Sequence, residues 1–214
     1  GMFVQTGDFV RADGTNANTA MTFYGQEKVD YNAKLCLMNM AVHGLNGKIK
    51  SGDEANTFYH DAHSLAGTCD YVMANPPFNL ANWGADRLRD YVRWKYGVPP
   101  AGNANFAWLQ HMIFHLAPNG KIGLVLANGS LASQSGGEGE IRKNIINDDL
   151  VSCIVAMPTQ LFYTTQISVS LWFLSRNKKQ KGKTCFIDAR KMGTMVTRKL
   201  RMLTDADIAK LAAV

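Results

Sequence analysis

Cysteine and proline are scarce in this chain, with four cysteines and six prolines among 214 residues, and no long apolar run occurs. The cysteines lie far apart and include no Cys-x-x-Cys pair, which predicts reduced thiols, mostly in the core, and no disulfide framework. No stretch of about 18 apolar residues and no signal-peptide pattern is present. We therefore expect no membrane association and a cytoplasmic location.

Metal-ligand sets are also lacking. His111 and His115 lie four residues apart in an expected helix, and His60 and His63 lie three apart in an expected loop. No carboxylate or thiol completes a set at metal-binding spacing, so we expect no metal site.

Acidic residues are fewer than basic ones: the chain has 17 Asp and Glu and 23 Lys and Arg, which gives a net charge of +6. The basic residues concentrate at 87–95 and 176–201. This balance suits a polyanionic partner, and the alternative for the second run is a solvated surface. Apolar residues make up 46% of the chain, enough for the core of one domain or slightly more.

Helices alternate with short apolar strands along the sequence. The clearest helix spans 27–43, where an apolar residue recurs at helical spacing and Gly44 provides the stop. The other predicted helices are 106–116 and 141–147, and the predicted strands are 21–24, 58–60, 71–74, 121–127, 151–157 and 169–174.

This alternation predicts an α/β fold with a doubly wound, mostly parallel sheet that is covered on both faces. Strand 169–174 follows strand 151–157 after a loop of only about ten residues, too short for a parallel crossover, so we expect an antiparallel hairpin strand there. Ligands of such sheets bind beyond the carboxyl ends of the strands.

The most informative motif is Asn75-Pro76-Pro77-Phe78, which directly follows the expected strand 71–74. The prolines stiffen the turn and carry no N–H, so the Asn75 side-chain oxygen and the Pro76 carbonyl can accept both hydrogens of an exocyclic amine. Two such acceptors favour the transition state in which the amine lone pair is freed for attack. Phe78 offers an apolar face for stacking on a flipped base. The alternative is an ordinary strand-ending turn.

The motif resembles the Asp/Asn/Ser-Pro-Pro-Tyr/Phe loop of amino-methyltransferases that use S-adenosylmethionine, and its Asn and Phe are similar to the adenine-N6 branch. Segments 38–44, 102–112, 117–120 and 139–143 resemble, more narrowly, the modification (methylation) subunit of type I restriction-modification systems. The resemblance covers nearly the whole chain. It implies a DNA adenine-N6 methyltransferase that acts on double-stranded DNA together with specificity and restriction subunits.

For S-adenosylmethionine, the resemblance implies carboxylates after the second and third strands. Glu27 is placed to accept hydrogen bonds from the ribose hydroxyls, and Asp61 to contact the adenine amino group. Their alternatives are a carboxylate at a helix N-terminus and an Asx turn. The family's glycine-rich loop ends in Gly-Gly-Met-Phe-Val, so Gly1, before Met2-Phe3-Val4, is either its last glycine or an added residue.

These patterns lead us to expect a catalytic domain at 1–200 that is truncated at its N-terminus and lacks its first strand. Residues 201–214 resemble the start of a C-terminal helical segment. We expect little activity from this chain alone.

The family also presents an aromatic residue that stacks on the flipped base from the side opposite the catalytic loop. Phe162, on the loop after strand 151–157, is our choice; Tyr163 competes, and a core role for Phe162 is the alternative. Two other functions stay open. One is a methyltransferase acting on a protein glutamine amide or an RNA guanine amine, and the other is a non-catalytic DNA-binding or assembly module.

Overall fold

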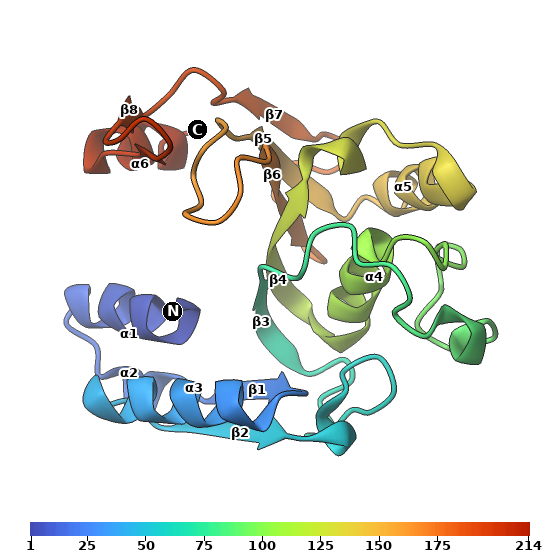
Figure 1. The fold of residues 1–214 in the computed structure, drawn as a ribbon, viewed down its shortest axis with the longest axis horizontal. Coiled ribbons are helices and arrows are strands. Elements are labelled where there is room, and N and C mark those ends of the chain that lie inside the picture. Colours follow the sequence, from blue (N-terminus) through green and yellow to red (C-terminus); the bar gives the residue numbers. More distant parts are fainter. The chain divides into compact units, whose positions relative to one another are not determined.

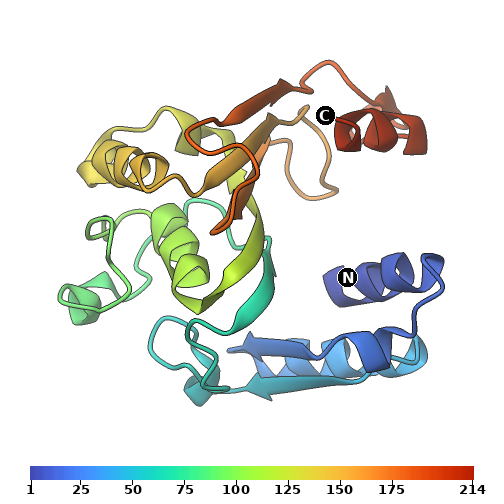
Figure 2. The same cartoon turned by 180° about the vertical axis from the view of Figure 1, so that it is seen from behind.

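A computed structural model describes residues 1–214 and divides the chain into two compact units, Gly1–Ala66 and Gly67–Val214 (Figures 1 and 2). Each unit combines helices with its own sheet and has its own apolar core. The expected boundary at residues 200 and 201 stays a prediction. No helix combines the length and the apolar character that crossing a bilayer requires.

The first unit is built on two parallel strands, β1 (Phe23–Glu27) and β2 (Gly47–Ser51). Its core joins Val4, Phe23, Met40 and Leu45. The other elements of this unit are helices α1 (Met2–Ala12), α2 (Ala17–Ala20) and α3 (Asp30–Val42) and the short 3-10 helix η1 (Asp53–Ala55). The strand predicted at 58–60 is wrong, because these residues form a turn, and the strand lies at β2 instead. Lys48 and Lys50 alternate with Ile49 there and obscured it.

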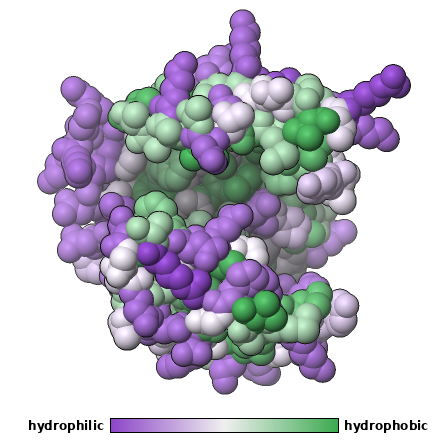
Figure 3. Space-filling model, turned by 90° about the vertical axis from the view of Figure 1, so that its left-hand side faces the viewer, coloured by the Kyte–Doolittle hydropathy of each residue, from purple (hydrophilic) through white to green (hydrophobic).

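The helix predicted at 27–43 is confirmed as α3, and Gly44 ends it at a positive φ of 63° that a residue with a Cβ adopts only with strain. Its apolar stripe does not face the sheet, because Tyr31 and Val42 are 68% and 78% exposed. Met40 packs instead against β2, and its terminal carbon lies so close to Gly47 that a side chain at position 47 would clash with it. Apolar groups also reach the surface in the lower part of Figure 3.

The second unit contains a five-stranded sheet in the order β3-β4-β6-β5-β7. β3, β4, β5 and β7 run parallel, and β6 runs antiparallel between β4 and β5, which confirms the expected hairpin strand. The strands are β3 (Cys69–Ala74), β4 (Leu116–Ala127), β5 (Val151–Ala156), β6 (Val169–Ser175) and β7 (Cys185–Asp188), with a small hairpin of β8 (Thr194–Met195) and β9 (Arg201–Met202). The helices are α4 (Asn105–His115), α5 (Glu138–Asn147) and α6 (Asp205–Ala212), with 3-10 turns η2 (Ala85–Leu88), η3 (Asn128–Leu131) and η4 (Ser135–Gly137).

Helices α4 and α5 cover one face of this sheet and enclose the main core (Figure 1). Phe106 of α4 meets Trp172 of β6 edge to face, with ring centroids 6.2 Å apart, and both side chains are fully buried. The expectation that both faces are covered is not met within this unit. On the other face Tyr71, Met73 and Phe173 are exposed.

Arg176, at the end of β6, fastens α4 to the sheet. Its Nη2 donates to the Ile113 carbonyl at 2.8 Å and its Nε to the Leu116 carbonyl at 3.1 Å. Ile113 lies in the last turn of α4, where its carbonyl also accepts from the Leu116 N–H, and Leu116 begins β4.

Replacing Arg176 with Met should lower the free energy of unfolding by about 1 to 3 kcal/mol, because it removes two hydrogen bonds from a charged donor to partly buried carbonyls. Urea denaturation followed by circular dichroism measures this. Lys179→Met is the matched control, since Lys179 is exposed and has no recorded partner. Equal losses for both variants would contradict a helix-fastening role.

Candidate active site

The Asn75-Pro76-Pro77-Phe78 loop leaves β3 at its carboxyl end. Asn75 is exposed and Pro76 is buried, so the loop is anchored by one proline while the amide next to it faces solvent. Phe78 is half-buried. This arrangement leaves the Asn75 side chain accessible to solvent beyond the end of the strand.

Two asparagines brace this loop against α4. The Asn79 N–H donates to Asn105 Oδ1 at 3.2 Å, and Asn105 Nδ2 donates back to Asn79 Oδ1 at 3.0 Å. Asn105 is only 2% exposed, and Asn79 has a positive φ of 52°. Asparagine tolerates that left-handed conformation better than most residues. A further bond joins the Ala104 N–H to the Leu80 carbonyl at 2.9 Å. The residues just after the motif are therefore held by a reciprocal amide pair in which Asn105 is buried and Asn79 is exposed.

The structure brings Phe78 and Phe162 together. Their ring centroids lie 5.6 Å apart, with the rings inclined at 66°. Both rings pack against a separate apolar cluster built on Val155, Met157 and Val169. Tyr163, the competing residue, is 90% exposed and has no recorded ring contact. The contact follows from topology, because β3 and β5 run parallel and their following loops emerge at the same edge of the sheet.

The loop that carries Phe162 is held by Gln160. This residue has a positive φ of 66°, which is uncommon for a residue other than glycine. Its carbonyl accepts from the Arg201 N–H at 2.7 Å, and its Nε2 donates to the Arg198 carbonyl at 3.3 Å. The loop is thus tied to the β8–β9 hairpin on one side and rests on Phe78 on the other.

In the first unit, Glu27 ends β1, where a cofactor-binding carboxylate is expected. Its Oε1 accepts from the Val29 N–H at 2.8 Å, and no partner is recorded for its Oε2. That oxygen is available to accept from a ribose hydroxyl. A carboxylate acceptor at this strand end therefore fits the ribose of the cofactor that the family resemblance implies.

Gln26 and His63 dock the Asp61 segment onto the carboxyl end of β1. Gln26 Nε2 donates to the His60 carbonyl at 3.0 Å, and its Oε1 accepts from the Ala62 N–H at 3.2 Å. His63 Nε2 lies 2.9 Å from the Gly25 carbonyl. Sequence reasoning assigned Gln26 no role, although its place just before Glu27 was a usable signal.

Asp61 itself is engaged by its own loop. Its Oδ1 accepts from the Leu65 N–H and its Oδ2 from the Ala66 N–H, each at 3.0 Å. These bonds fit the turn role given above as the alternative for Asp61. Gly1 precedes helix α1 and is exposed. Cofactor roles for Asp61 and Gly1 stay predictions.

The histidine pairs form no metal centre, and no group of three or more potential ligands occurs in residues 1–214. Arg93 Nη1 lies 2.6 Å from His111 Nδ1. Burial, then His115 and Arg93, lower the pKa of His111 well below its usual value, so the ring is neutral at pH 7 and accepts from the guanidinium.

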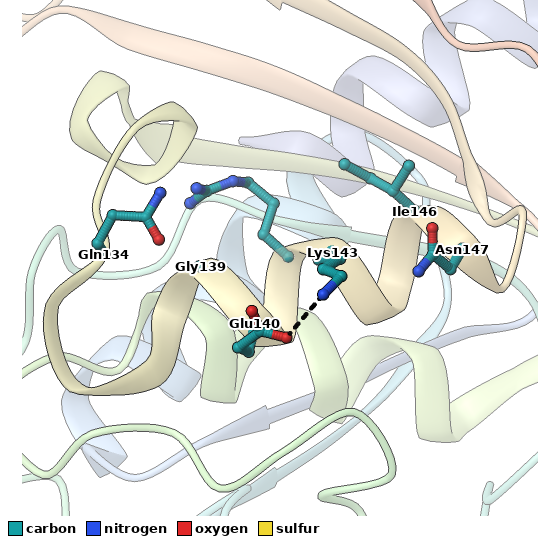
Figure 4. Close-up of a pocket in the computed structure, with 7 residues that line it drawn as sticks. Gln134, Gly139, Glu140, Lys143, Ile146 and Asn147 are labelled. Atoms are coloured by element: carbon teal, nitrogen blue, oxygen red, sulfur yellow. Dashed lines mark hydrogen bonds and ion pairs between the residues drawn. The ribbon is translucent and has the colours of Figure 1, made fainter.

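The two best-defined surface grooves lie away from the Asn-Pro-Pro-Phe loop. One, of about 370 Å³, follows α5, where Glu140 and Lys143 form an ion pair at 3.3 Å (Figure 4). The other, of about 550 Å³, is lined by Lys95, Asp148 and Arg176, near the amino ends of the strands. Neither groove is lined by a predicted catalytic, cofactor-binding or base-stacking residue, so we place the site by its chemistry and topology.

A mostly parallel sheet with an antiparallel strand inserted beside its last members is the fold of S-adenosylmethionine-dependent methyltransferases. Residues 1–214 match the sequence profile of the family described as N-6 DNA Methylase. The chain belongs to this family.

Named relatives narrow the comparison. The chain is 53% identical to the type I restriction enzyme HindI methylase subunit of Haemophilus influenzae over 99% of its length and 47% of that protein. It is 42% identical to the MjaIX methylase subunit of Methanocaldococcus jannaschii, over 99% of the chain and 38% of that protein. The solved type I methyltransferase subunit from Streptococcus thermophilus superposes with a TM-score of 0.79 at 25% identity, covering 90% of this chain and 47% of that one. The chain thus spans half or less of the length of these relatives.

Replacing Asn105 with Ala should release the Asn75–Leu80 loop, because both amide bonds to Asn79 are lost. We expect the Asn79 amide, and the Ala104 amide that donates to Leu80, to exchange with solvent at least tenfold faster, and the free energy of unfolding to fall by about 1 to 3 kcal/mol. Hydrogen-deuterium exchange measures the first effect.

Asn147→Ala is the control, since Asn147 is an exposed amide with no recorded hydrogen bond. Unchanged exchange in the loop of Asn105→Ala would contradict the bracing role.

Proposed function

We propose that this chain is the catalytic part of a DNA adenine-N6 methyltransferase, the modification subunit of a type I restriction-modification system. The observation that carries the proposal is the contact of Phe78 with Phe162 beside Asn75 and Pro76, at the carboxyl edge of the sheet. The relatives named above, all type I subunits, favour DNA over a protein glutamine or an RNA amine as acceptor.

The catalytic loop would act on the adenine amino group. One N–H of that group donates to Asn75 Oδ1 and the other to the Pro76 carbonyl. In the free base the nitrogen lone pair is delocalised into the ring, so the amine is a poor nucleophile. As the nitrogen becomes pyramidal in the transition state it gains positive charge, and both acceptors then bind its hydrogens more strongly. The loop therefore stabilises the transition state more than the bound base.

The aromatic residues and the carboxylates would position the two reactants. Phe78 and Phe162 stack on the flipped base and exclude water from its faces. Glu27, with Asp61 and Gly1 as further candidates, holds S-adenosylmethionine. When bound, this cofactor supplies an electrophilic methyl group. Alignment of the amine by the chain contributes most of the rate.

The partners follow the same proposal. We infer that the complete protein works on double-stranded DNA with a specificity subunit and a restriction subunit, as the names of its relatives suggest. A cytoplasmic location accords with this partner. The methyl-transfer rate of residues 1–214 alone can be compared with that of a longer protein that contains them.

The proposed chemistry is tested in a chimaera in which this chain replaces the matching segment of the HindI methylase subunit. Asn75→Ala should lower kcat by about 100-fold or more, roughly 3 kcal/mol, because an acceptor that acts mainly in the transition state is lost. Cofactor binding should stay within a few-fold.

Tritiated methyl transfer to unmethylated DNA gives the rate, and calorimetry gives the cofactor affinity. Asn75→Asp is the control, since it keeps a side-chain oxygen at the same position and should retain measurable turnover. A near-normal kcat for Asn75→Ala would refute the catalytic role of the loop.

Phe162→Ala in the same chimaera should weaken trapping of the flipped adenine by about 1 to 3 kcal/mol, the range for one base-aromatic stack. Fluorescence of 2-aminopurine at the target position reports the extrahelical base. Tyr163→Ala, which removes an exposed ring, should leave the signal unchanged. A signal lost in Tyr163→Ala and kept in Phe162→Ala would assign base stacking to Tyr163. An unchanged signal in both variants would show that this loop does not stack on the base.

A further inference from the structure

The stretch after β7 is basic and contains no acidic side chain. Between Ala189 and Arg201 the sequence has five Lys and Arg residues and no Asp or Glu. Because β7 runs parallel to β5, this stretch begins at the carboxyl edge of the sheet, the edge from which the Phe162 loop also emerges. The charge is therefore placed on the side of the candidate site.

Two of these cations stand at the tip of the β8–β9 hairpin. The Val196 and Thr197 N–H groups both donate to the Leu200 carbonyl, which closes the turn. Arg198 and Lys199 are exposed in that turn, and no carboxylate partner is recorded for either. Hydrophilic side chains project from the upper part of Figure 3, which views the side of α6 and β8.

The remaining cations of this stretch are mostly occupied. Arg190 binds Asp188 through two contacts of 2.8 and 2.7 Å. Arg201 Nη1 donates to the Met192 and Gly193 carbonyls at 3.2 and 3.0 Å. The nearest acid on α6, Asp207, is used as a cap, accepting from the Thr204 N–H at 2.9 Å. Arg198 and Lys199 at the hairpin tip are thus exposed cations of this stretch for which no carboxylate partner is recorded.

The hairpin is joined mechanically to the Phe162 loop. Gln160 bonds to both Arg198 and Arg201 through the main chain of the hairpin. Met192 and Leu203, which flank the hairpin, pack in the same apolar cluster as Phe78 and Phe162. A ligand held by the aromatic pair would therefore lie beside the hairpin.

A second basic cluster offers a comparison at the opposite edge. Lys178, Lys179, Lys181 and Lys183 precede the amino end of β7. Lys178 is buried against Asp149 at 2.5 Å, and the Gly182 N–H donates to the same carboxylate. This cluster has its own structural acid and lies at the far end of the strands.

We propose that the β8–β9 hairpin is a phosphate clamp, in which Arg198 and Lys199 bind backbone phosphates of the DNA strand that flanks the flipped adenine. The inference rests on the proposed function in so far as its partner is DNA. The cations supply charge without reading sequence, and the apolar pair beside them receives the base.

The test uses the chain of residues 1–214 and a fluorescein-labelled duplex of about 30 base pairs, without cofactor, and measures affinity by anisotropy between about 50 and 200 mM KCl. One variant is Arg198→Gln with Lys199→Gln. The control, Lys179→Gln with Lys181→Gln, removes the same charge from the opposite edge. Each phosphate contact contributes about 0.9 to the slope of log K against log salt.

For the hairpin variant we expect a slope smaller by about 1 to 2 and an affinity about tenfold lower near 100 mM salt. The control should keep the slope within about 0.5 of the unaltered chain. Equal losses in the two variants, an unchanged hairpin variant, or no binding by the unaltered chain would each overturn the clamp. These outcomes are independent of methyl transfer, so a failure here is distinguishable from a failure of the proposed chemistry.

Discussion

The antiparallel insertion of β6 between β4 and β5 is the constraint on which the candidate base-binding half depends. Because β6 is antiparallel to both neighbours, β4 and β5 remain parallel, and the loops after β3 and β5 leave the sheet at one edge. A strand that ran parallel in this position would need a long crossover. The short return through 157–168 instead keeps the aromatic loop beside the Asn-Pro-Pro-Phe turn, and the contact of Phe78 with Phe162 is the result.

The core beneath this edge determines how firmly the loops are held. Phe106, Leu109 and Trp172 are fully buried and fix α4 against the sheet. Asn105, at the first turn of the same helix, is thereby placed under the Asn-Pro-Pro-Phe loop. Burying an amide without partners would cost about 1 to 3 kcal/mol, and the reciprocal bonds to Asn79 remove that cost. The same Asn79–Asn105 bonds therefore stabilise α4 and fix the geometry of the loop.

Much of this could be predicted from the sequence, and the misses have physical causes. Apolar runs predicted β3, β5 and β6, and the periodicity of Phe106, Leu109 and Ile113 predicted the buried face of α4. β2 was missed because its exposed lysines interrupt the apolar signal. The apolar stripe on α3 predicted the helix but does not identify its buried side, where Met40 packs against Gly47. The Asn79–Asn105 pair spans 26 residues, and one sequence carries no signal of such a contact.

Magnitudes decide whether the observed aromatic contact helps or hinders the proposed function. Stacked bases lie about 3.4 Å apart, so two rings that clamp a base need a separation of roughly 7 Å. Phe78 and Phe162 are 5.6 Å apart and touch each other. Base entry must therefore break one aromatic contact, worth about 0.5 to 1.5 kcal/mol. It then forms two stacks, each worth about 1 to 3 kcal/mol. Under the proposed function this exchange favours the base, and in the closed pair both rings stay half-buried. Gln160 ties the Phe162 loop to the β8–β9 hairpin. If Phe162 moves away from Phe78 while these bonds stay intact, the hairpin moves with it. Phosphate contact at the hairpin and base entry between the rings thus act on the same loop.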